Sequence, residues 1–258
     1  DDLAASLLPS RLRLRVGLTR IDALRRAAIA ASNRTGPGLW ASIACRKRYI
    51  DERLSDPVNE FDTVVILGSG LDTRAYRIAR HSDLPVFEVD QQVNIDRKAA
   101  VVQRVLGVAP ESVHLVPVDF EQDDLMSVLA AHGYRADGRT FFLWEGVTQY
   151  LAPEAVRASL SQLSGAATGS RLIVTYIRQD FIDGTQTYGA EAVYRRFRQR
   201  SQLWKSGLVP EEVGDLLAEF GWRLVEQAGP SYYRDTYIRP TGRALSASPI
   251  EWTALAER

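Results

Sequence analysis

Two glycines and two aspartates stand where neighbouring parallel strands would bring them together. Gly68 and Gly70 directly follow a short apolar run, Asp90 ends the next such run, and Asp119 with Phe120 follows the one after that. Glycine allows a positive φ and leaves room for a ligand close to the backbone. An acid in the place of Asp90 can accept hydrogen bonds from both ribose hydroxyls, and Asp119 could accept one from an adenine amino group. The pattern predicts a nucleoside site, and the plainer alternative is a glycine turn with helix-capping aspartates.

The residues after the glycines distinguish two nucleoside cofactors. The dinucleotide fingerprint of NAD-binding proteins has a third glycine three residues after the second, but Thr73 occupies that place. Asp72, at the expected start of the next helix, would repel a pyrophosphate, which a helix N-terminus otherwise attracts. An acid there suits a cofactor whose nearby part is cationic, such as a sulfonium with an α-amino group. The sequence therefore favours S-adenosylmethionine over NAD.

Alternating apolar and amphipathic segments predict the sheet that would carry this site. The strands are expected in short apolar runs, at Thr63–Leu67, Leu84–Val89, Val113–Val118, Thr140–Trp144 and Arg171–Ile177. Helical spacing lies between them, at Asn94–Leu106, Asp124–His132 and Pro153–Leu163. Such alternation is typical of an α/β fold with a parallel sheet covered on both faces.

We expect one domain with four parts. They are an N-terminal helical cap at 1–60, a cofactor-binding core at 61–178, a lid insertion at 179–209, and a C-terminal helix and strand pair at 210–258. In the last part Pro210–Phe220 is predicted as a helix. The strand pair is predicted at Trp222–Gln227 and Tyr232–Ile238.

Composition excludes several classes of partner. Lys+Arg and Asp+Glu each number 32, so the net charge is zero and no global field would recruit nucleic acid or an anionic membrane. The single Cys45 excludes an internal disulfide and a multi-cysteine metal site. No run approaches the roughly 18 apolar residues of a transmembrane helix, and the first residues lack a secretory-signal pattern. We expect a cytoplasmic protein that acts on a small molecule, while its oligomeric state stays open.

Several segments resemble the leucine carboxyl methyltransferase family, above all its bacterial branch of provisionally named methyltransferases. They are LGSGLDTRAYRI (Leu67–Ile78), FEVDQ (Phe87–Gln91), Lys98, VPVDF (Val116–Phe120) and WEGVTQYL (Trp144–Leu151). The similar part runs from Arg46 to about Ile177. The resemblance implies a Rossmann-like, seven-stranded class I methyltransferase sheet with a helical cap, and S-adenosylmethionine as cofactor.

The resemblance also implies roles for single residues. Arg46 would pair with the cofactor carboxylate, and Glu145 would lie near its amino group and sulfonium. Gly68 and Gly70 would lie at the amino-acid part of the cofactor, Asp90 at its ribose, and Asp119 with Phe120 at its adenine.

Plainer alternatives exist for the charged residues. Arg46 lies in a basic stretch and could be a surface charge, and Glu145 could cap the next helix. Arg74, which the resemblance places near the site, could pack against Asp72 or Asp90 instead.

The acceptor is expected at the ends of the fourth and fifth strands and under the lid. The candidates, of which the first three are expected to act in the reaction, are Tyr150, Tyr176 and Arg178, then Tyr188, Tyr194 and Trp204. Arginine suits a carboxylate, whereas the lid aromatics could flank a flat ring or form the core of the cap.

The expected chemistry follows from the lack of a base. A hydroxyl acceptor needs a general base, but a carboxylate does not, and all three histidines (His81, His114 and His132) lie away from the expected site. We therefore expect O-methylation of a carboxylate on a small molecule. C- or N-methylation of an aromatic metabolite is one alternative, and nucleotide binding without catalysis is another.

Overall fold

The computed structural model describes residues 2–8, 10–55 and 61–258, and its centre is a seven-stranded sheet of order β3-β2-β1-β4-β5-β7-β6. The strands are β1 (Thr63–Leu67), β2 (Val86–Asp90), β3 (Val113–Pro117), β4 (Thr140–Trp144), β5 (Arg171–Ile177), β6 (Arg223–Ala228) and β7 (Glu251–Glu257). Strands β1 to β5 pair in parallel, and β7 runs antiparallel to β5 and β6. The predicted α/β sheet is confirmed.

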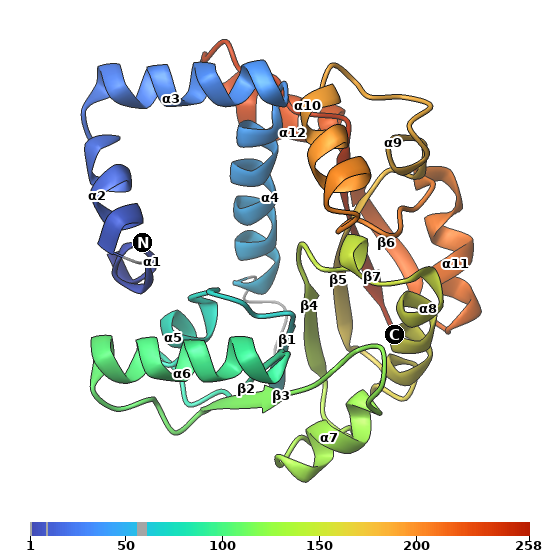
Figure 1. Ribbon diagram of the computed structural model, residues 1–258. Helices are drawn as coiled ribbons and strands as arrows, with labels where there is room; N and C mark the ends of the chain where they lie inside the picture. The colour runs from blue at the N-terminus through green and yellow to red at the C-terminus, as the bar shows by residue number, and fades with distance from the viewer. Residues whose placement is uncertain (1, 9, 56–60) are drawn as a thin grey trace.

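Helices cover both faces of this sheet (Figure 1). One face carries α7 (Leu125–Ala131), α8 (Pro153–Leu163) and α11 (Val213–Glu219), which follows the short turn η3 (Pro210–Glu212). The other face carries α4 (Leu39–Leu54), α5 (Arg74–Ile78), α6 (Gln92–Leu106) and α12 (Pro230–Tyr233). Because alternate residues of a strand point to opposite faces, Val65 and Leu67 pack with the first group and Val64 and Ile66 with the second. This explains why every residue of β1 is buried.

The N-terminal helices form an arm that leaves the body at α4 (Figure 1). They are α1 (Asp2–Leu7), α2 (Ser10–Leu18) and α3 (Asp22–Thr35), and α3 has no buried residue. Helix α4 belongs to the body instead, since Ala41, Cys45 and Tyr49 recur at four-residue spacing on its buried face. Within the described ranges no helix has the length and apolar character needed to cross a membrane.

The lid region, residues 179–209 as predicted from the sequence, consists of short helices above the ends of β4 and β5. They are α9 (Gln179–Asp183), α10 (Glu191–Tyr194) and the π-helical turn η2 (Arg195–Arg200), next to the 3-10 turn η1 (Thr148–Tyr150). Phe181 and Trp204 are buried in it, and the ring of Phe197 stacks on Trp204 with centroids 4.8 Å apart. Tyr194 meets Phe181 edge to face. The lid aromatics therefore form a core of their own, as the plainer alternative predicts.

The prediction of a strand at Tyr232–Ile238 is wrong. This segment is helical, since α12 continues into the π-helical turn η4 (Arg234–Ile238) and then η5 (Arg239–Thr241). Pro230 suits the first turn of a helix because its missing N–H would have no partner there. The actual partner of β6 is β7, at the end of the chain.

A buried ion pair joins α6 to β2. Lys98 Nζ lies 2.5 Å from Glu88 Oε1, and both side chains are inaccessible to solvent. The hydroxyl of Tyr76, on α5, donates to the other oxygen of Glu88 at 3.0 Å. Because Glu88 lies two residues before Asp90, this cluster fixes α5 and α6 beneath the end of β2.

We expect Lys98→Ala to lower the free energy of unfolding by about 3–5 kcal/mol, because it leaves a buried carboxylate without its cation. Replacing both partners, as Glu88→Gln with Lys98→Met, removes both charges and should recover most of the loss. Urea unfolding of the three proteins measures these values. A loss below about 1 kcal/mol in Lys98→Ala would show that the pair is worth no more than an exposed one.

Candidate active site

The ends of β1 to β4 open on one cavity of about 420 Å³. Five residues expected at the site from the sequence line it: Gly68, Asp90, Asp119, Phe120 and Tyr150. The other lining residues are Gln91, Asn94, Glu121, Gly146, Val147, Leu151 and Lys205. The sheet therefore brings together the predicted nucleoside residues at its carboxyl edge.

Asp90 organises the floor of this cavity. One of its oxygens accepts the N–H of Gly70 at 2.7 Å, and the other accepts the N–H of Gln91 at 2.8 Å and the side-chain amide of Asn94 at 2.7 Å. A carboxylate offers about four acceptor positions. The three donors therefore leave Asp90 about one position for a ligand hydroxyl.

The glycine loop bends sharply after β1. Gly68 has φ +73° and Gly70 has φ +44°, in the region that favours glycine. The N–H groups of Gly68 and Ser69 both donate to the carbonyl of Val89, at 2.7 and 2.9 Å, so the loop curls over the end of β2. A Cβ on Gly68 would collide with Cγ2 of Val147, whereas one on Gly70 would meet no atom. Of these two glycines, Gly68 is the one required by both its backbone angle and its neighbour.

Asp119 and Phe120 border the other end of the cavity. Asp119 Oδ1 accepts the N–H of Glu121 at 2.9 Å, and the ring of Phe120 lies 6.3 Å from that of Trp144. Lys205 reaches this end from the lid, where its Nζ pairs with Glu121 at 2.7 Å.

Sequence reasoning missed Asn94 and Lys205. Asn94 stands four residues after Asp90, in the first turn of the helix that follows, and that spacing could have shown it. Lys205 carries no local signal, because its position depends on the bond of its N–H to the carbonyl of Gln149.

Arg46 lies inside the molecule, between two acids. Its Nε donates to Glu145 Oε1 at 2.7 Å, its Nη1 donates to Glu251, and its side chain is only 13% exposed. It is therefore not the surface charge of the plainer alternative. Lys47 adds a second cation 3.4 Å from Glu145. These residues join α4 to the end of β4 and the start of β7.

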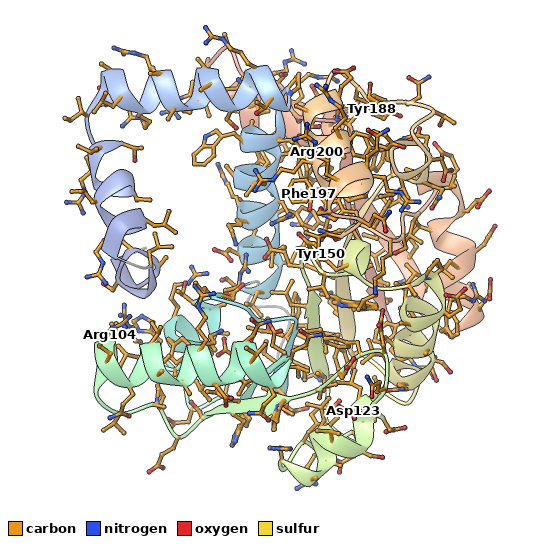
Figure 2. All side chains as sticks on the ribbon, in the orientation of Figure 1. Arg104, Asp123, Tyr150, Tyr188, Phe197 and Arg200 are labelled. Atoms are coloured by element: carbon orange, nitrogen blue, oxygen red, sulfur yellow. The ribbon has the colours of Figure 1, made fainter. Side chains whose placement is uncertain are left out.

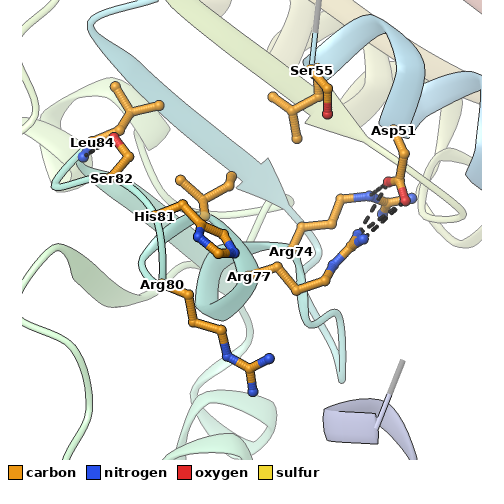
Figure 3. A pocket seen from close by; sticks show the side chains of 10 residues that line it. Asp51, Ser55, Arg74, Arg77, Arg80, His81, Ser82 and Leu84 are labelled. Carbon is orange, nitrogen blue, oxygen red and sulfur yellow. Dashed lines mark hydrogen bonds and ion pairs between the residues drawn. The ribbon is translucent and has the colours of Figure 1, made fainter.

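Arg74 connects the same acid to the glycine loop. Its Nη1 donates to Glu145 Oε2 at 2.6 Å and to Asp72, while its Nε donates to Asp51 at 2.6 Å. Arg74 thus packs against Asp72, not Asp90, and Glu145 does not cap a helix because both its oxygens accept from arginines. Figure 3 shows Arg74 and Arg77 converging on the carboxylate of Asp51, at a second cavity of about 600 Å³.

The arginines keep Glu145 ionised. Burial raises the pKa of Glu145, but the charges of Arg46, Arg74 and Lys47 outweigh this and lower it to about 2. Glu145 is therefore a permanent negative charge, and Arg74 connects it to Asp72, which follows the glycine loop.

Of the three residues expected to act in the reaction, the structure brings only Tyr150 to the cavity, with 40% exposure (Figure 2). Tyr176 points to the face under α8 and α11, where it is wholly buried and its hydroxyl has no partner among the described residues. Arg178 pairs with Asp180 at 2.8 Å and does not line the cavity. Alternate residues of a strand point to the same face of a sheet. Tyr176 therefore points to the same buried face of β5 as Val174.

The histidines also lie elsewhere. His81 borders the second cavity, His114 stacks on Phe87 with centroids 4.6 Å apart, and Nδ1 of His132 lies 2.8 Å from the carbonyl of Val128. In the part of the chain that the structure describes, no three His, Cys, Asp or Glu residues form a group that could hold a metal ion. The cavity lining therefore contains neither a histidine base nor a metal site.

We expect Gly68→Ala to reduce stability by about 1–3 kcal/mol, through positive-φ strain and collision with Val147. Gly68→Ala with Val147→Ala removes the collision and should recover part of the loss, and Gly70→Ala, with open space around its Cβ, is the matched control. Urea unfolding measures all three. Equal losses in Gly68→Ala and Gly70→Ala would show that Val147 does not restrict the loop.

Comparison with known proteins identifies the family. The family model for leucine carboxyl methyltransferase matches residues 1–164. A Mycolicibacterium paratuberculosis protein, named provisionally as an S-adenosyl-L-methionine-dependent methyltransferase, is 36% identical over 213 residues, which cover 81% of this chain and 63% of that protein. The chain thus spans less than two thirds of the length of this relative.

Solved structures show the same fold. A provisionally named methyltransferase from Thermobifida fusca aligns over 91% of this chain and 88% of its own, with a TM-score of 0.64 and 20% identity. Magnesium protoporphyrin IX methyltransferase from Synechocystis, solved with S-adenosylhomocysteine (SAH) bound, aligns over 84% and 85%, with a TM-score of 0.53 and 13% identity. These likenesses concern the fold and confirm the predicted class I methyltransferase sheet. The family model and the mycobacterial relative lead to one conclusion: the chain belongs to the leucine carboxyl methyltransferase family.

Proposed function

We propose that this chain binds S-adenosylmethionine in the 420 Å³ cavity and transfers its methyl group to a small-molecule carboxylate. The observation that carries the proposal is the meeting of Gly68, Asp90 and Asp119 from three successive strand ends on that cavity. The names of the bacterial relatives and the SAH bound to a protein of the same fold support the choice of cofactor.

The nucleoside half of the cofactor fits the polar groups of the cavity. Asp90 would accept one ribose hydroxyl at its remaining position, and a second would have to replace one of its present donors. The Asn94 amide is the donor that a side-chain rotation can move, since the other two are backbone N–H groups. Asp119 and Phe120 would hold the adenine by a hydrogen bond and ring contact.

The amino-acid half would extend from the cavity to the charged network, which does not line the cavity but adjoins it where Gly146 follows Glu145. This half carries one carboxylate and one ammonium, and the network contains both a largely buried guanidinium, Arg46, and two largely buried acids, Glu145 and Asp72. Arg46 would bind the carboxylate by paired N–H donors, and the acids would hold the cationic part. A pyrophosphate would find Asp72 in its place, so a dinucleotide fits less well.

When bound, the cofactor supplies a methyl group on a positively charged sulfur. The residues of this chain would orient it, exclude water and leave one side open for the acceptor. Tyr150, exposed at the cavity, is the side chain closest to such a role among the three expected from sequence.

A carboxylate acceptor suits this lining best. It arrives as an anion and needs no proton removed, which matches a lining without histidine. The main support for methylation of an aromatic metabolite was that rings of the lid could flank it. The rings of Phe197 and Trp204 instead stack on each other, so these faces are already covered. Arg178, whose guanidinium bonds Asp180, would need to exchange that partner to hold an acceptor.

Asp90→Ala should weaken the binding of SAH about 10- to 100-fold, because it removes a charged hydrogen-bond acceptor from the ribose. Isothermal titration calorimetry measures this. Asp96→Ala is the matched control, since Asp96 lies exposed on the same β2–α6 unit and does not line the cavity. Undiminished affinity in Asp90→Ala, or tighter binding of NAD than of SAH by the wild type, would contradict the proposed site.

Incubation with methyl-labelled cofactor and a panel of carboxylic acids tests the acceptor. We expect labelled methyl esters, recognised by their release of methanol in base, and about 10- to 100-fold less product from Asp90→Ala at a cofactor concentration below the dissociation constant of the wild type. Label found only on carbon or nitrogen of added aromatic compounds would refute the carboxylate assignment while leaving methyl transfer intact.

A further inference from the structure

Glu251 is a buried acid that contacts the candidate site through Arg46. It lies outside all the sequence motifs that predicted the site. It begins β7, its side chain is 8% exposed, and it accepts a hydrogen bond from Arg46 Nη1. The two residues are 205 positions apart in the chain.

The antiparallel direction of β7 explains its place. Strands β1 to β5 end at the carboxyl edge of the sheet, but β7 begins there, and Glu251 pairs in register with Ile177 at the end of β5. An acid at the first position of this strand therefore reaches the same edge as Glu145, which follows β4. Arg46, from α4, lies between the two.

The contacts of Arg46 leave donors for a ligand. A guanidinium has five N–H groups in a rigid plane, and the described hydrogen bonds use one on Nε, for Glu145, and one on Nη1, for Glu251. Two carboxylates on different atoms fix both the position and the rotation of that plane. The directions of the unused N–H donors, including both on Nη2, are thereby fixed as well.

We propose that Glu251 is a positioning residue, which holds the guanidinium of Arg46 in the orientation that binds the carboxylate of the cofactor. The inference rests on the proposed function, because it assigns Arg46 to that carboxylate. Glu251 itself touches no part of the cofactor in this account. Its effect is confined to the amino-acid half, since Asp90 and the adenine residues lie on the cavity and make no bond to it.

Two ligands separate this role from a structural one. SAH carries the amino-acid half, whereas 5′-methylthioadenosine has the same nucleoside without it. Calorimetry with both ligands is carried out on wild type, Glu251→Ala and Glu251→Gln. Glu257→Gln is the matched control, because Glu257 ends the same strand in an exposed ion pair with Arg223.

We expect Glu251→Ala to weaken SAH binding about 10- to 100-fold and to change methylthioadenosine binding less than about twofold. Glu251→Gln keeps an acceptor oxygen without the charge, so it should lose less. In an Arg46→Ala background, Glu251→Ala should have no further effect on SAH affinity, as expected of a residue that acts through Arg46.

Three results would overturn the inference. Unchanged SAH affinity would show that Arg46 needs no second acid, and tighter SAH binding would show that Glu251 competes for the carboxylate's place. Equal losses for both ligands would show a structural role, and Glu251→Gln provides the same comparison if the alanine variant does not fold. If the wild type binds neither ligand, the proposed function itself fails and the inference falls with it.

Discussion

Glu145 lies between two arginines, the largely buried Arg46 and the buried Arg74, and this arrangement determines the geometry of the candidate site. A buried charge is tolerated only when partners satisfy it, so each member of the network restricts the others. Arg46 ties Glu145 to α4 and β7, and Arg74 ties it to the glycine loop and α4. Segments from the two ends of the chain are thereby held at one edge of the sheet. The cost of burying these charges is offset by mutual pairing, and the site is left with fixed charges of both signs.

The sheet topology supplies the rest. Parallel strands end at the same edge, so the residues after β1, β2, β3 and β4 meet on one cavity. The buried pair of Glu88 and Lys98 holds α6 beneath this edge, and α6 in turn presents Asn94 to Asp90. The cavity and the charged network therefore lie at the same edge of the sheet, and we propose that the cavity binds the nucleoside half of the cofactor and the network its zwitterionic half.

Local sequence pattern predicted the features that depend on neighbouring residues. Buried strands such as Thr63–Leu67 are short apolar runs, and Gly68, Asp90 and Asp119 directly follow or end such runs. Other features depend on distant packing. Tyr232–Ile238 has the aromatic and β-branched residues of a strand, but Glu251–Glu257 takes the place between β5 and β6, and Tyr232–Ile238 packs as a helix. Tyr176 is buried because of strand parity, and the partners of Arg46 and Lys205 arise from segments far away in the chain.

A crystal structure of the protein with SAH tests the central claim most directly. We predict adenine beside Asp119 and Phe120, a ribose hydroxyl on Asp90, and the homocysteine carboxylate on Arg46, which still contacts Glu145. Binding of the nucleoside outside this cavity, or a carboxylate that makes no contact with Arg46, would contradict it.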